Sequence, residues 1–207
     1  MMPRQRVWKT ATRRSSSMSS AEELQKELMT VRRNAIELHS SDQVQEAIGK
    51  LAFEVTEACS GKVPVFVTIM NGGMIFAAEL VKRLDFPLEM DYLHASRYLG
   101  ATTGGEVEWI VTPSATLQGR HVVIVDDILD VGSTLLSIIE ACKSQGAASV
   151  KTCVLVDKKH DRKARPGLKA DFTALEADDY YLFGMGMDYK GFWRNAPGIY
   201  AVKESDL

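Results

Sequence analysis

The stretch Val122–Leu135 reads V-V-I-V-D-D-I-L-D-V-G-S-T-L and decides the fold of this chain. Four consecutive apolar, β-favouring residues lead into the adjacent carboxylates Asp126 and Asp127, and a third carboxylate, Asp130, follows. A Gly-Ser-Thr turn at 132–134 then precedes a helix-like apolar run. The stretch therefore predicts a buried strand, an acidic turn and the N-terminus of a helix.

Such a strand–loop–helix unit can bind phosphate, because unpaired N–H groups of the first helical turn point at the anion and a glycine allows close approach. The carboxylates repel phosphate, so they require a ligand that also carries hydroxyls, Mg²⁺ or a developing positive charge. A ribose phosphate with a leaving pyrophosphate has all three. A P-loop nucleotidase also ends a strand in acidic residues, but its G-x-x-x-x-G-K-[ST] loop is absent. A plain helix cap would need only one carboxylate.

Further motifs follow in a characteristic order over about residues 63–202. They are M-N-G-G at 70–73, H-A-S-R-Y at 94–98, T-G-G-E at 103–106, D-K-K-H-D-R-K-A at 157–164 and M-D-Y-K-G-F-W-R-N at 187–195. In this combination the chain resembles the type I phosphoribosyltransferases, most closely a bacterial-type branch of the hypoxanthine-guanine phosphoribosyltransferases. The resemblance implies an α/β fold with a central, mostly parallel twisted sheet, flanking helices and a small hood. It also implies a purine salvage enzyme that uses phosphoribosyl pyrophosphate and hypoxanthine or guanine to make IMP or GMP plus pyrophosphate.

The same resemblance implies roles for the acidic residues. Asp130 matches the general acid/base that handles the proton at N7 of the purine. Asp126 and Asp127 would hold the ribose hydroxyls and the Mg²⁺ shell, although the family usually has Glu-Asp here, and Asp188 would lie near a second Mg²⁺. The loop that would cradle the 5′-phosphate consists of Val131, Gly132, Ser133 and Thr134.

Pyrophosphate would be bound by a second loop, which includes Asn71 and Gly72. In relatives this loop contains a non-proline cis peptide, which by position would be Met70–Asn71. Asn71 replaces a basic residue found in several relatives, so the resemblance does not imply a charge pair there. Arg194 matches the arginine that binds pyrophosphate with its fork of donors.

A third group of residues would recognise the purine base. Lys158 matches the lysine that donates to the 6-oxo group, and a donor there favours hypoxanthine and guanine over adenine. Lys159 is the adjacent alternative. Tyr181 matches a ring that stacks on the base, with core packing as its alternative, and Leu182 would offer backbone contacts. A preference for xanthine stays open, because the 2-position is read largely by backbone groups.

The remaining polar candidates are less specific. Arg97 and Tyr98 match a mobile loop that closes during turnover, with an ordinary solvated loop as the alternative. The histidines lack metal-ligand spacing, and we interpret them as surface or structurally satisfied residues: His39, His94, His121 and His160.

Composition bounds the architecture. A chain of 207 residues with 45% apolar and 25% charged residues predicts one α/β domain. Residues 1–19 form a basic, Ser/Arg-rich tail, which we predict to be disordered; a transit peptide is the alternative. The tail carries +5, so that −7 falls on the rest of a chain whose total is −2, and an acidic body argues against nucleic-acid binding. We expect a single phosphoribosyltransferase domain at 20–207, its hood contributed by the N-terminal helices and the C-terminal segment.

The periodicity predicts helices at 20–38, 41–59 and 73–84, and strands at 63–69, 88–94, 106–111 and 149–156. The first helix would open with a capping box at Ser20–Glu23, and the second with a Ser40-to-Gln43 cap. No apolar run is long enough to span a bilayer. The cysteines, Cys59, Cys142 and Cys153, form neither a disulfide framework nor a zinc motif, so we read them as buried cytosolic thiols.

Two other functions are alternatives to a 6-oxopurine phosphoribosyltransferase. One is a regulator that senses phosphoribosyl pyrophosphate and binds RNA or DNA, supported only by the basic tail. The other is an enzyme acting on orotate or uracil, which conflicts with Lys158 and the Tyr181–Leu182 pair. We therefore expect phosphoribosyl pyrophosphate and 6-oxopurines as substrates, no nucleic-acid or membrane partner, a cytoplasmic location, and a homodimer or homotetramer as in the family.

Overall fold

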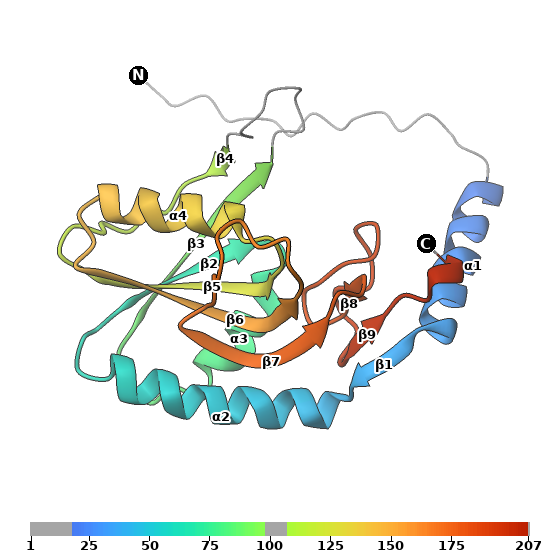
Figure 1. The fold of residues 1–207 in the computed structure, drawn as a ribbon, viewed down its shortest axis with the longest axis horizontal. Coiled ribbons are helices and arrows are strands. Elements are labelled where there is room, and N and C mark those ends of the chain that lie inside the picture. The colour runs from blue at the N-terminus through green and yellow to red at the C-terminus, as the bar shows by residue number, and fades with distance from the viewer. Residues whose placement is uncertain (1–17, 98–106, 207) are drawn as a thin grey trace, which may run out of the picture.

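The structure is a computed structural model that describes residues 18–97 and 107–206, and its core is a six-stranded sheet (Figure 1). The strands are β2 (Val65–Met70), β3 (Glu89–Arg97), β4 (Val107–Val111), β5 (His121–Leu129), β6 (Ser149–Lys159) and β7 (Phe172–Asp178). They lie in the order β4-β3-β2-β5-β6-β7, and every neighbouring pair is parallel except β3 and β4. The mostly parallel sheet confirms the predicted α/β class.

Helices cover both faces of this sheet. On one face lie α2 (Ser41–Cys59) and α3 (Gly73–Val81), and α4 (Ser133–Ser144) lies on the other (Figure 1). Successive residues of β2 therefore alternate between two cores: Phe66 packs with α2 and α3, and Val67 packs with α4. A strand buried on both faces reads as a continuous apolar run, which explains the sequence at the start of β5.

A second, three-stranded antiparallel sheet lies beside the main one (Figure 1). Its strands are β1 (Ile36–His39), β9 (Ile199–Ala201) and β8 (Leu182–Phe183), and α1 (Met18–Asn34) packs against them. A short 3-10 helix at Glu204–Asp206 follows β9. Arg32 of α1 lies over the Tyr200 ring, with 3.8 Å from its guanidinium carbon to the ring centroid. Of the two N-terminal helices expected in the hood, α1 belongs to this unit, and α2 packs on the main sheet.

The N-terminal elements correct the sequence-based boundaries. The predicted helix over 20–38 is wrong in its last residues, because α1 ends at Asn34 and β1 follows. Only pairing with β9, far along the chain, makes this segment a strand. Ser20 lies inside α1 and not at its start, whereas the predicted cap of α2 is confirmed: the Ser40 hydroxyl accepts from the Gln43 N–H, and the Gln43 side chain accepts from the Ser40 N–H.

The strands that lead to the site are longer than predicted. Because β5 pairs with β6 as far as Leu129, Asp126 and Asp127 lie within the strand, and the predicted acidic turn begins only at Asp130. Lys158 likewise lies within β6 and not after it. Arg97 is the last residue of β3, so it is not in the loop, and the assignment of Tyr98 lies outside the described residues.

The predicted disordered tail also lies outside the described residues, apart from its last two residues, Met18 and Ser19, which begin α1. Among the helices of the described segments, none is both long and apolar enough to cross a membrane.

Candidate active site

The carboxyl ends of three neighbouring parallel strands, β2, β5 and β6, open into one cavity of about 370 Å³. Ligands of open α/β sheets bind at this edge. The cavity is lined by Ile69, Met70, Asn71, Gly72, Asp126, Asp127, Ile128, Asp130, Lys158, Tyr181, Leu182, Met187, Asp188 and Arg194. The fold thus brings together most of the residues that the sequence singled out.

The loop after β2 packs very closely against β5. The peptide bond Met70–Asn71 is cis, as the resemblance implies. Gly72 has no room for a side chain, because a Cβ there would collide with the Asp127 carboxylate. A Cβ on Gly186 would in turn collide with the Gly72 carbonyl oxygen. The glycines therefore let this loop and the segment after β8 close around Asp127.

Asp126 and Asp127 form a pair of neighbouring acids at the end of β5. Asp127 is buried, Asp126 is partly buried, and the Asp127 N–H donates to Asp126 Oδ1 at 3.0 Å. Burial raises the pKa of both carboxyls, and the charge of Asp127 raises that of Asp126 further. Among the described residues, neither carboxylate has a Lys or Arg nitrogen within ion-pair distance. This end of the cavity therefore carries negative charge that is not paired.

The opposite end of the cavity contains a compensated charge network. Lys158 is buried, and its Nζ lies 3.1 Å from Asp179 Oδ1 and 3.6 Å from Asp130 Oδ2. Arg162 holds Asp179 from the far side, with 2.6 Å from one guanidinium nitrogen to each carboxylate oxygen. Hydrogen bonds from Arg162 and then Lys158 lower the pKa of Asp179 to about 2. Lys159, the alternative reader, is exposed and pairs with Glu176.

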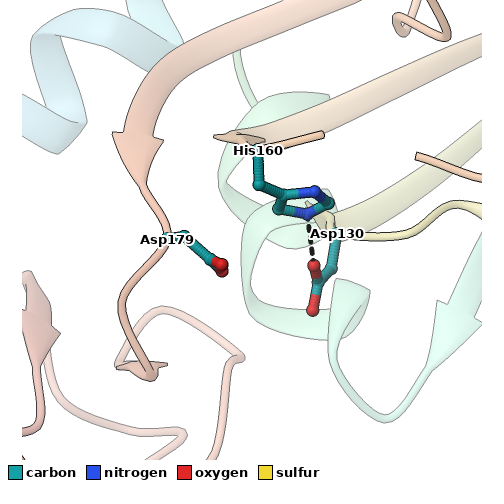
Figure 2. A group of neighbouring side chains, drawn as sticks. All are labelled: Asp130, His160 and Asp179. Atoms are coloured by element: carbon teal, nitrogen blue, oxygen red, sulfur yellow. Dashed lines mark hydrogen bonds and ion pairs between the residues drawn. The ribbon is translucent and has the colours of Figure 1, made fainter. Parts of the chain in front are cut away.

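His160 is the site residue that sequence reasoning missed. Its side chain is only 4% exposed, and Figure 2 shows the ring directed at Asp130, with 2.6 Å between Nε2 and Oδ1. It is therefore a satisfied histidine and not a surface one. The available signal was its position two residues after Lys158, since alternate residues of an extended segment share a face.

Asp188 and Arg194 bind each other at the third side of the cavity. One guanidinium nitrogen lies 2.6 Å from Asp188 Oδ1, and the other donates to the Gly186 carbonyl at 2.6 Å. Asp188 Oδ2 accepts from the Gly191 N–H at 2.6 Å. Both side chains line the cavity, so the arginine is held with its donors next to the acidic pair.

The aromatic position also faces the cavity. Tyr181 is 43% exposed, which argues against the core-packing alternative, and it contacts Tyr189 edge-on with 5.9 Å between ring centroids. Leu182 is buried at the start of β8, so it can offer the cavity only its backbone and the edge of its side chain. Met187 is buried and also lines the cavity.

The predicted phosphate loop follows directly after Asp130. Gly132 has φ +83° and precedes the first turn of α4, which begins at Ser133. A Cβ on Gly132 would lie 2.5 Å from a methyl of Leu168, and the positive φ would strain any residue with a side chain at this position. The loop does not line the cavity itself; it adjoins the cavity through Asp130. Its turn presents the N–H groups of a helix N-terminus, as the sequence predicted.

Comparison with known proteins agrees with this geometry. The family described as the phosphoribosyl transferase domain matches residues 34–190. The hypoxanthine-guanine phosphoribosyltransferase of Streptococcus pneumoniae is 38% identical over 168 residues, which cover 81% of this chain and 92% of that protein. The hypoxanthine-guanine-xanthine phosphoribosyltransferase of Tritrichomonas foetus is 34% identical and covers 81% and 91%. A crystal structure of a hypoxanthine phosphoribosyltransferase from Staphylococcus aureus matches with a TM-score of 0.77 at 32% identity, covering 82% of this chain and 92% of that one.

The sheet and its cavity define a type I phosphoribosyltransferase fold. The chain belongs to the phosphoribosyltransferase family, in its hypoxanthine-guanine branch.

Proposed function

We propose that the protein transfers the 5-phosphoribosyl group of phosphoribosyl pyrophosphate to hypoxanthine or guanine, giving IMP or GMP plus pyrophosphate in purine salvage. The observation that carries this proposal is the pair Lys158 and Asp130, a donor and a carboxylate 3.6 Å apart on one side of the cavity. The 6-oxo group and N7 are neighbours on one edge of a 6-oxopurine, and they need a donor and an acceptor at this spacing. The names of the relatives from S. pneumoniae and T. foetus support the same substrates.

The base would lie between this polar edge and Tyr181. Lys158 Nζ donates to the 6-oxo group, and an amino group at that position, as in adenine, would leave the ammonium facing another donor. Asp130 accepts the N7 proton as the bond to the ribose forms. Tyr181 stacks on the ring, and the Leu182 backbone contacts the remaining edge.

Phosphoribosyl pyrophosphate would occupy the acidic side of the cavity. Asp126 and Asp127 accept hydrogen bonds from the ribose hydroxyls and stabilise the positive charge that develops at the anomeric carbon. Arg194, with Asn71 and Gly72, binds the pyrophosphate. The loop Val131, Gly132, Ser133 and Thr134 binds the 5′-phosphate through its N–H groups and hydroxyls.

Mg²⁺ is the cofactor that fits these residues. Asp126, Asp127 and Asp188 offer carboxylate oxygens, the donors that Mg²⁺ prefers. Among the described residues the first two have no ion pair, although the nearby charge of Arg194 lowers the pKa of Asp127 against the rise that burial causes. When bound, Mg²⁺ neutralises charge on the leaving pyrophosphate. We keep Tyr98 as part of the predicted closing loop, and Arg97 is the last residue of the strand that leads into it.

A spectrophotometric assay with phosphoribosyl pyrophosphate and Mg²⁺ tests the proposal on hypoxanthine, guanine, xanthine and adenine in parallel. We expect nucleotide from the first two and little from adenine, and the xanthine rate decides whether the substrate range extends further. No turnover on any base, with phosphoribosyl pyrophosphate still bound, would overturn the proposal in favour of the sensor function.

We further propose a homodimer or homotetramer in the cytoplasm. The assembly is supported by Met90, Tyr92 and Ile110, large apolar side chains that are each about half exposed on β3 and β4. The location is supported by three free and buried thiols, Cys59, Cys142 and Cys153. Light scattering after size-exclusion chromatography tests the assembly, and a monomeric mass would contradict it.

A further inference from the structure

His160 contacts the one carboxylate in the cavity that is assigned to proton transfer. Its Nε2 lies 2.6 Å from Asp130 Oδ1 (Figure 2). The other oxygen, Asp130 Oδ2, lies 3.6 Å from Lys158 Nζ. The two carboxylate oxygens therefore have different neighbours. Oδ1 is occupied by the imidazole, and Oδ2 lies on the side of the lysine that lines the cavity.

The backbone fixes which imidazole nitrogen carries the proton. The Arg162 N–H donates to His160 Nδ1 at 3.0 Å, so Nδ1 is an acceptor and carries no proton. The neutral ring then has its proton on Nε2, which donates it to Asp130 Oδ1. The imidazole is 4% exposed and the Asp130 side chain is 43% exposed, so the donor end of this hydrogen bond is shielded from water and the carboxylate end is open to the cavity.

A metal site is the other chemistry that these side chains could provide. Ligand atoms of Asp130, His160 and Asp179 lie within 4.8 Å of one another. However, the Lys158 ammonium already lies 3.1 Å from Asp179 and 3.6 Å from Asp130, so a cation occupies the position between the two carboxylates. A divalent ion there would face that ammonium at close range, which disfavours the metal site.

We infer that His160 is a positioning residue for Asp130, an inference that rests on the proposed function. By donating to Oδ1 it stabilises the ionised carboxylate, and it leaves Oδ2 as the oxygen that receives the N7 proton. In many enzymes a catalytic group is oriented by a hydrogen bond to a third residue, and His160 would orient Asp130 in the same way. Lys158 alone could not do this, because it must also donate to the base.

Charged groups from several elements surround Asp130 and can influence the pH dependence of the reaction. They are Lys158 on β6, Arg162 after β6, and Asp179 after β7, with Asp126 and Asp127 earlier on β5. Replacing His160 keeps these charged side chains, but it removes the acceptor of the Arg162 N–H as well as the donor to Asp130. A shift in the pH profile is therefore assigned to the hydrogen bond to Asp130 only when a variant that retains a donor at this position reverses it.

The test compares His160→Phe, which removes the donor, with His160→Gln, which retains a neutral N–H donor. We expect His160→Phe to lower kcat/KM for hypoxanthine by about 10- to 100-fold, as the loss of an orienting partner commonly does. We expect the acidic limb of its pH profile to move up by about one pH unit or more, because a hydrogen bond to a charged group is lost. His160→Gln should restore most of the rate and the wild-type limb.

The KM for phosphoribosyl pyrophosphate should stay within about threefold in both variants, since the acidic pair is untouched. An unchanged pH profile in His160→Phe, in a protein whose wild-type form is active, would overturn the role of His160 alone. An inactive wild-type protein would instead overturn the proposed function. Equal loss in the Phe and Gln variants, with the limb unmoved, would show that the ring serves only packing.

Discussion

The two ends of the cavity differ in how their charges are compensated. At one end Asp126 and Asp127 are neighbouring carboxylates with raised pKa values and no ion pair among the described residues. At the other end Asp179 has two cationic partners, and its pKa is lowered to about 2. The carboxylates at the first end require a ligand that supplies positive charge, whereas Asp179 at the second end is already paired with two cationic side chains. In the proposed function this difference divides the substrates: phosphoribosyl pyrophosphate with Mg²⁺ would bind at the acidic pair, and the neutral base would bind at the network.

The largest effect is expected from Asp130→Asn, which removes the proton acceptor at the base end. We expect turnover to fall by a factor on the order of 10²–10⁴, because an amide cannot take the N7 proton. Binding of Mg²⁺–phosphoribosyl pyrophosphate, measured by calorimetry, should remain, since the acidic pair is intact. Near-wild-type turnover would rule out the proton role.

A smaller effect is expected from Lys158→Met, which keeps the length of the side chain and removes its charge. The KM for hypoxanthine should rise by about 10- to 100-fold, because a charged hydrogen bond to the 6-oxo group is lost. Lys159→Met is the matched control: this lysine is exposed and pairs with Glu176, so we expect a change within about twofold. If the two variants behaved alike, the base would be read elsewhere.

A third prediction concerns stability at the acidic end, measured without Mg²⁺ or substrate. The folded state raises the pKa of Asp126 above its ordinary value of 3.8, so ionisation costs stability as pH rises from that value through the raised one. Asp126→Asn removes this cost, and we expect its Tm at pH 7 to exceed that of the wild type by roughly 2–4 °C.

The advantage of Asp126→Asn should shrink as pH falls toward the ordinary value of 3.8 and vanish below it, where the wild-type carboxyl is protonated in the unfolded state as well as in the folded one. If Asp126→Asn still bound hypoxanthine but had a lower Tm than the wild type at pH 7, Asp126 would not be a buried charge that destabilises the folded state.

The smallest effect is expected from Arg162→Ala, which removes the outer partner of Asp179. The arginine is exposed, so its ion pair is screened, and Lys158 remains at 3.1 Å from Asp179. We expect less than about threefold change in kcat/KM for hypoxanthine. A large loss of kcat/KM would mean that Arg162 is needed to keep Asp179 and Lys158 in position.

The sequence predicted local features well, because they depend on neighbouring residues. The apolar run at Val122 and the glycine at 132 specify a buried strand and a tight turn wherever they occur, and both are confirmed. The cap of α2 is confirmed for the same reason.

Features that depend on distant segments could not be predicted. The strand at Ile36 exists because it pairs with β9, and β5 continues through Asp127 because β6 pairs alongside it. His160 and Asp179 carry no motif of their own. They become part of the site only when the segments after β6 and β7 converge on Asp130.

The most direct test of the account measures initial rates over a grid of phosphoribosyl pyrophosphate and hypoxanthine concentrations for wild type, Asp126→Asn and Lys158→Met. If the two ends of the cavity bind different substrates, we expect Asp126→Asn to raise mainly the KM for phosphoribosyl pyrophosphate and Lys158→Met to raise mainly the KM for hypoxanthine. If both variants raised both constants equally, the two ends of the cavity would not divide the substrates between them, and the account would be wrong.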